Sequence, residues 1–186
     1  MGLDIAVRFE VETASVAEPE PDRLRRALSR TFCDFMCRRN AVDGTPELDQ
    51  IGALTGVDIA PLYAMDSYRT QAEAEDEARL ARSADEQARI YAAARESRSR
   101  LAGNLDHVLQ TVQALIERLA AMDDLANRLD DPGDHLLNPT QYFAHFADDR
   151  NEGYLANHFG TDLRNLRRQL QQAKAAGANT AYFSYG

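Results

Sequence analysis

Eight acidic side chains gather between residues 123 and 152, where only two arginines accompany them, so the stretch has a local charge of −6. They are Asp123, Asp124, Asp130, Asp131, Asp134, Asp148, Asp149 and Glu152. Such a stretch suits a basic protein partner, because complementary charge speeds the encounter and selects the partner. Aspartates are also common in solvated turns and at helix ends, which is the alternative interpretation. We predict that these eight residues bind a partner.

Three histidines lie in or near the same stretch, namely His135, His145 and His158. With Asp134, Asp148 and Asp149 they are the residue types that bind transition metals, so a metal-dependent hydrolase using residues 135–158 is the enzyme alternative. His145 and Asp148 are one helical turn apart. However, the spacing matches neither HExxH nor an EF-hand loop. We therefore predict no metal, no cofactor and no catalytic residue.

Two cysteines, Cys33 and Cys37, are four residues apart on a predicted helix and share a face with Arg26 and Arg30. Neighbouring arginines would lower the pKa of a thiol and make it reactive. The spacing is not CxxC, and a disulfide across one helical turn would be strained. We expect both cysteines to act as small apolar residues that contact a second layer.

Residues 51–66 have the outline of a helix-turn-helix, with a glycine in the turn and apolar residues behind it. The second segment, residues 58–66, contains Pro61 and two aspartates but no arginine. The next arginine after this segment is Arg69. A DNA-reading helix needs donors for base edges, and a net charge of −9 disfavours contact with phosphates. We favour two packed short helices and no nucleic-acid partner, and a helix-turn-helix-like regulator is the second alternative.

The two ends of the chain have the patterns of β-strands. Leu3, Ile5, Val7, Phe9 and Val11 alternate with mostly polar residues, which predicts a half-buried strand over residues 2–11. The aromatic segment 180–185 is its candidate partner, because one strand is not stable alone. We predict a small sheet formed by the two termini. Residues 12–21, rich in proline and glutamate, are predicted as a linker.

Helices are predicted over residues 22–176, with the first beginning after Asp22 and the last capped by Thr161. The strongest pattern runs from Leu105 to Leu129, where apolar residues recur at alternating intervals of three and four. Residues 68–100 contain two capping-box sequences, so they form one helix or two. The chain then either continues as one long helix or turns at Gly103-Asn104. We favour the turn, which predicts a protruding hairpin over residues 68–130 whose thin alanine face could form a homodimer.

Taken together, these patterns predict a mainly α (α+β) fold in a single domain, residues 1–186: a helical bundle with a long helical hairpin and a small terminal sheet. No apolar run reaches the length of a membrane span, and the N-terminus does not resemble a signal peptide. We therefore expect a cytoplasmic protein without a membrane partner.

The 20 arginines against one lysine are typical of a GC-rich bacterial genome. The sequence lacks GxGxxG, GxxxxGK[ST] and GxSxG motifs. The functional prediction is a non-catalytic acidic binding protein for a basic partner, such as an immunity protein that antagonises a toxin.

Overall fold

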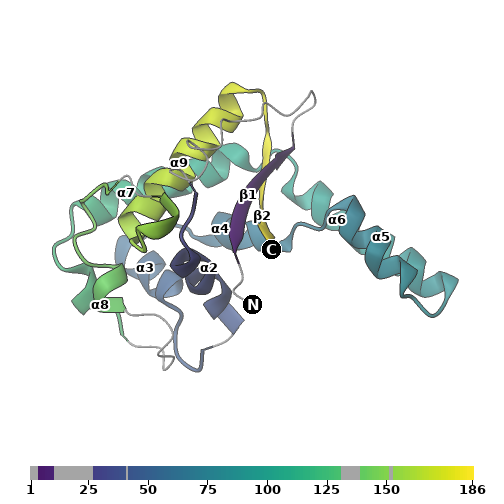
Figure 1. Ribbon diagram of the computed structural model, residues 1–186, viewed down its shortest axis with the longest axis horizontal. Helices are drawn as coiled ribbons and strands as arrows, with labels where there is room; N and C mark the ends of the chain where they lie inside the picture. The colour runs from purple at the N-terminus through teal and green to yellow at the C-terminus, as the bar shows by residue number, and fades with distance from the viewer. Residues whose placement is uncertain (1–3, 11–26, 41, 131–138, 151–152) are drawn as a thin grey trace.

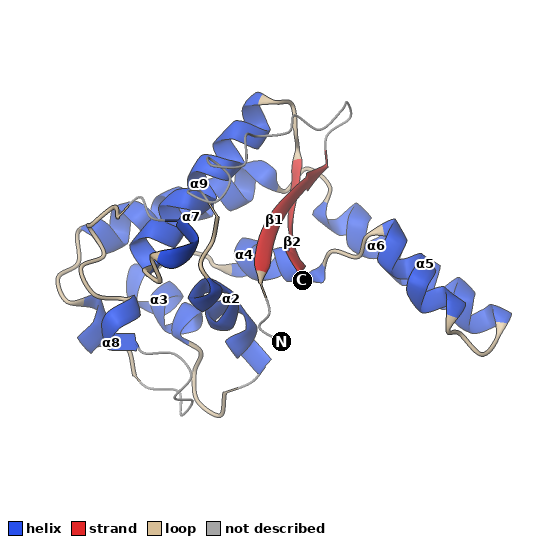
Figure 2. Ribbon diagram, viewed as in Figure 1, coloured by secondary structure: helices blue, strands red, loops and turns tan. Residues whose placement is uncertain are grey.

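The computed structural model describes residues 4–10, 27–40, 42–130, 139–150 and 153–186. Strand β1 (Ile5–Glu10) pairs antiparallel with β2 (Thr180–Tyr185), so that Ile5 lies opposite Tyr185 and Glu10 opposite Thr180. One face of this sheet buries Val7 and Phe183 in the core. The predicted sheet between the two ends of the chain is therefore confirmed, and so is the mainly α fold class (Figures 1 and 2).

The segments between the strands are helical. The α-helices are α2 (Arg30–Cys37), α3 (Glu47–Thr55), α4 (Ala60–Ala64), α5 (Gln71–Arg79), α6 (Ala84–Leu101), α7 (Leu105–Ala120), α8 (Pro139–Tyr142) and α9 (Phe159–Ala175). Short 3-10 helices are η1 (Arg38–Asn40), η2 (Met65–Ser67), η3 (Leu125–Arg128) and η4 (Gly153–Leu155). Within the described ranges, no helix is long and apolar enough to cross a membrane.

Helices α7 and α9 form the centre of the bundle and run in opposite directions. Asp106 at the start of α7 pairs with Lys174 at the end of α9, with 2.6 Å between Oδ1 and Nζ. The apolar face that the sequence predicts for α7 is buried, and Leu115 and Leu119 have no exposed surface. Burying a leucine side chain contributes about 2 kcal/mol, so this helix contributes strongly to the stability of the core. Because the pair is antiparallel, the end of α7 and the start of α9 lie at the same end of the molecule (Figure 1).

The first described helix begins later than predicted. The N-cap of α2 is Ser29, whose hydroxyl accepts a hydrogen bond from the Phe32 N–H. The predicted start at Asp22 and the linker 12–21 lie outside the described residues, whereas Ala27 and Leu28 precede the helix in non-helical conformation. Ser29 ends the non-helical segment because its side chain satisfies one of the free N–H groups of the first helical turn.

The start of α9 and the end of α7 also differ from the predictions. His158, and not Thr161, is the N-cap of α9, because its ring nitrogen Nδ1 accepts from the Thr161 N–H. Helix α7 ends at Ala120 instead of near Leu129, and Asp124, four residues later, has a left-handed conformation (φ 58°) that precedes η3. Leu125 nevertheless stays buried in the core from the following 3-10 helix.

The predicted hairpin exists, but its two arms differ from the expected ones. The chain does break at Gly103, which has φ +76°, as expected. The antiparallel pair is nevertheless α5 with α6, joined by residues 80–83, and it projects away from the bundle (Figure 1). Both capping sequences therefore begin separate helices: Thr70 caps α5 and Ser83 caps α6.

Candidate functional site

The first half of the predicted partner-binding surface is the turn that follows α7. Asp123, Asp124 and Asp130 are all exposed there. Asp124 is partly engaged, since its carboxylate accepts a hydrogen bond from Asn127 Nδ2 at 2.7 Å. Within the described ranges, none of these three carboxylates takes part in a salt bridge. The three side chains therefore face the solvent without a basic partner in the described part of the chain.

A side chain of α3 holds this acidic turn in place. Gln50 Oε1 accepts from the Asp130 N–H at 2.7 Å, and Gln50 Nε2 donates to the Asp130 carbonyl at 2.9 Å. At its other end the turn is anchored by Leu125, which is only 2% exposed. The two amide hydrogen bonds and the buried leucine fix the position of this segment, unlike that of a surface loop without such contacts.

An exposed apolar residue lies on the same side of α3. Leu54 follows Gln50 by four positions, which places it on the same helical face, and 40% of its surface is exposed. A single exposed leucine is ordinary on protein surfaces. Here it lies one helical turn from Gln50, which holds the acidic turn, and apolar residues with charged surroundings are the usual composition of protein interfaces.

The second half of the predicted surface, Asp148 and Asp149, lies beside the start of α9. The Asp149 carboxylate forms a salt bridge with Arg168, and Arg164 Nη1 donates to the Asp148 carbonyl at 3.1 Å. The charge of Asp149 is therefore balanced within the molecule, while the Asp148 carboxylate makes no salt bridge in the described part of the chain. Because α7 and α9 are antiparallel, both halves lie at one end of the bundle. Three predicted members, Asp131, Asp134 and Glu152, lie outside the described residues.

The histidines do not assemble as a metal site would require. His158 is fully buried, and its two ring nitrogens already contact Thr161 (Nδ1 to Oγ1, 3.0 Å) and the Ala144 carbonyl (Nε2, 2.8 Å). His145 is exposed in a left-handed turn, and His135 lies outside the described residues. Among the residues that are described, no three His, Cys, Asp or Glu side chains could hold one ion. His158 is structural, because it caps α9.

The two cysteines have different environments. Cys33 is fully buried in the core, and burial raises the pKa of its thiol to about 12. Cys37 is exposed, yet partial burial of its sulfur also raises its pKa above the usual 9.0. Both thiols therefore stay protonated near neutral pH and are poor nucleophiles. The expectation that the cysteines act as small apolar residues is therefore confirmed for the buried Cys33, whereas Cys37 lies at the surface.

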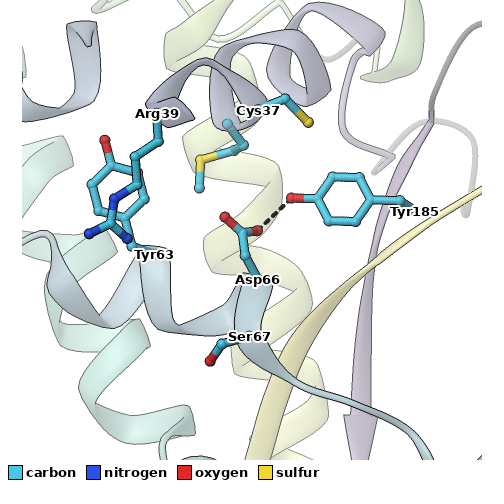
Figure 3. A pocket seen from close by; sticks show the side chains of 7 residues that line it. Cys37, Arg39, Tyr63, Asp66, Ser67 and Tyr185 are labelled. Carbon is cyan, nitrogen blue, oxygen red and sulfur yellow. Dashed lines mark hydrogen bonds between the residues drawn. The ribbon is translucent and has the colours of Figure 1, made fainter. Parts of the chain in front are cut away.

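An open pocket of about 370 Å³ lies where the end of β2 meets α2, α4 and η2 (Figure 3). The Tyr185 hydroxyl donates a hydrogen bond to the Asp66 carboxylate, and the Arg39 guanidinium lies 4.1 Å above the centre of the Tyr63 ring. Burial raises the pKa of Asp66, while the Tyr185 hydrogen bond and Arg39 lower it. Ser67 Oγ donates to the Ala64 carbonyl, so its proton is engaged.

The hydroxyl and the thiol that line this pocket are both protonated near neutral pH. Burial raises the pKa of the Tyr185 hydroxyl, which keeps it protonated, and Cys37 at the rim is protonated as well. The pocket also contains the guanidinium of Arg39, which donates hydrogen bonds, and the carboxylate of Asp66, which accepts them. Together these two groups can hold a small polar group or a side chain of a partner. Sequence reasoning missed it because Asp66 and Tyr185 are 119 positions apart.

A second feature that the sequence did not indicate is a buried carboxylate. Asp162 on α9 has no exposed surface and accepts three hydrogen bonds: from the Ser29 N–H (2.8 Å), the Ser29 hydroxyl (2.7 Å) and the Tyr142 hydroxyl (3.0 Å). Burial raises its pKa to about 7 despite these donors. The group joins α2, α8 and α9, and its complete burial makes it a structural connection instead of a reactive centre.

Comparison with protein-family models, with curated proteins and with solved structures gave no match.

The helix-turn-helix outline is present only in part. Helix α3 ends at Gly56, which is left-handed (φ 68°), and α4 begins after Asp58, whose carboxylate accepts from the Ala60 N–H at 3.0 Å. Helix α4 spans only five residues, Ala60–Ala64, and buries Leu62 and Tyr63. So short a helix has little exposed face left to read a DNA groove.

Proposed function

We propose that this protein is a binding protein that engages a basic protein partner through its acidic end. The acidic end is defined as Asp123, Asp124, Asp130 and Asp148 together with Leu54. The proposal depends on one observation: the carboxylates of the turn after α7 are exposed, carry no salt bridge in the described part of the chain, and are fixed by Gln50 and Leu125. A fixed negative surface requires little reordering when a partner binds.

Electrostatics favours a basic partner over other classes. A net charge of −9 repels nucleic acids and anionic membranes, and it attracts cationic proteins over distances of about 8–10 Å at physiological ionic strength. Complementary charge raises association rates more than it raises affinity. Rapid capture of a basic protein is the property that a toxin antagonist needs, so an immunity-type protein of a bacterial cytoplasm is the most concrete form of the proposal.

Self-association through a protruding hairpin within residues 68–130 is the other interaction that the sequence predicts, and the part of this region that projects is the α5–α6 hairpin. It does not compete with the acidic end, because the hairpin projects from the opposite side of the molecule (Figure 1). Both interactions can therefore occur in one molecule.

The test is a binding assay against purified basic proteins encoded by neighbouring genes. One variant changes Asp123, Asp124, Asp130 and Asp148 to Asn. A control with the same change in net charge alters four exposed acids of the hairpin, namely Asp76→Asn, Glu77→Gln, Asp85→Asn and Glu96→Gln. We expect the first variant to associate about tenfold more slowly or worse, and the control to stay near the wild type. Equal rates for both variants, or no binding by any such protein, would contradict the proposal.

A further inference from the structure

The α5–α6 hairpin extends away from the body of the molecule (Figures 1 and 2). The side chains that it buries between its two helices are mainly Ala74, Ala78 and Ala94. Small side chains let the helices approach closely but remove little apolar surface from water. Isolated helices of this length are marginal in water, so the hairpin would gain stability from a further layer.

Apolar surface that such a layer could cover is present on the hairpin. Leu80 in the turn between the helices is 85% exposed, and Tyr91 in the middle of α6 is 36% exposed. The alanines Ala84, Ala88 and Ala92 are exposed on the outer side of α6. Tyrosine is enriched in protein interfaces, because it combines a large apolar ring with a hydroxyl group.

A groove of about 400 Å³ runs along one side of the hairpin and is formed by both helices. Gln71 of α5 and Tyr91, Arg95 and Arg98 of α6 line it. Arg98 Nη2 donates to Gln71 Oε1 at 3.2 Å, and Gln71 Nε2 donates to Glu75 Oε1 at 2.9 Å. Glu75 therefore borders the groove on the α5 side, opposite the arginines of α6.

The two helices have complementary charges. Helix α5 has four acidic residues and one arginine, a charge of −3, and α6 has four arginines and three acidic residues, a charge of +1. Beside the groove, Glu75 and Arg95 are both exposed, and in the described part of the chain neither takes part in a salt bridge. A surface that has both signs in this arrangement is complementary to a second copy of itself.

We propose that two copies of this protein associate through the groove side of the hairpin, with Tyr91 at the centre and Glu75 of one copy facing Arg95 of the other. The two hairpins then form a four-helix arrangement in which α5 of one copy lies next to α6 of the other, with neighbouring helices antiparallel. A two-fold interface repeats each contact, so the Glu75–Arg95 pair occurs twice. This dimer is independent of the partner proposed for the acidic end.

The experiment uses the full chain in sedimentation equilibrium over a concentration series from micromolar to millimolar. The wild type should form a dimer. Glu75→Arg and Arg95→Glu should each weaken dimerisation by about tenfold or more, because each places two like-charged pairs across the two-fold axis. Arg89→Glu is the matched control, because Arg89 lies on a different side of α6 and its change in charge equals that of Arg95→Glu.

Mixing the two weakened variants gives the decisive result. A heterodimer of Glu75→Arg with Arg95→Glu again has an opposite charge at every contact, so the equimolar mixture should dimerise more tightly than either variant does alone. Circular dichroism establishes that each variant is folded. A monomeric wild type, single variants that dimerise like the wild type, a control that loses the dimer, or a mixture of folded variants that stays monomeric would each overturn the proposal.

Discussion

The buried carboxylate of Asp162 makes the stability of the protein depend on pH in a specific direction. Burial raises its pKa from 3.8 in the unfolded chain to about 7 in the folded protein. Between these two values the unfolded chain has lost the proton and the folded protein still binds it, so stability falls as pH rises. Each unit of pKa difference corresponds to about 1.4 kcal/mol, so the full change from this group is about 4 kcal/mol. Above pH 7 its contribution no longer changes.

The perturbation is Asp162→Asn, which keeps the size of the side chain and removes its titration. Urea unfolding followed by circular dichroism at several pH values from 4 to 8 gives the free energy of unfolding for both proteins. His158 acts in the opposite direction, because burial lowers its pKa below 6.5 and stability from that group rises with pH. The difference between wild type and variant isolates Asp162, since both retain His158.

We expect the wild type to lose stability relative to Asp162→Asn as pH rises from 4 to 7, by up to about 4 kcal/mol, and the difference to level off above pH 7. Exposed Asp148→Asn is the control and should follow the wild type. A difference between wild type and Asp162→Asn that stays constant with pH would refute the reasoning. It would mean that the three hydrogen-bond donors keep this carboxylate ionised at all these pH values.

Three further results should follow from the packing. Gly160→Ala should destabilise the protein by about 1–3 kcal/mol, because the added Cβ would lie 2.3 Å from the carbonyl oxygen of Phe146. Thermal unfolding measures this loss, and an unchanged melting temperature would contradict the tight contact. A thiol reagent should label Cys37 in the folded protein and Cys33 only after unfolding, as mass spectrometry can establish; labelling of both in the native state would contradict the burial of Cys33. Leu115→Ala should cost about 2–5 kcal/mol in urea unfolding, and a loss below about 1 kcal/mol would show that α7 is not central to the core.

Local sequence patterns predicted the elements whose structure depends on local periodicity. The alternation from Leu3 to Val11 predicted β1, and the aromatic end predicted β2, because an exposed strand needs a partner. The apolar spacing after Leu105 predicted helix α7 and its buried face. The capping sequences at Thr70 and Ser83 marked two helix starts, because a cap is satisfied by residues within one turn.

Contacts between distant segments could not be predicted in the same way. The pairing of α5 with α6 depends on where the alanine faces meet, and alanine gives only a weak periodic signal. No sequence pattern marks Asp162 as buried, because the Ser29 groups that donate to it lie 133 positions away. The two amide hydrogen bonds that hold Asp130 join it to Gln50, 80 positions away. Likewise, the pocket at Tyr185 forms only when the end of β2 reaches η2.

The most direct test of the central claim is the association rate of a basic partner as a function of ionic strength. Stopped-flow fluorescence would compare the wild type with the variant that has Asn at positions 123, 124, 130 and 148. Binding through the acidic end requires that the wild-type rate fall steeply with added salt and that the variant show both a lower rate and a shallower slope. Identical slopes for the two proteins would contradict the claim that these carboxylates attract the partner.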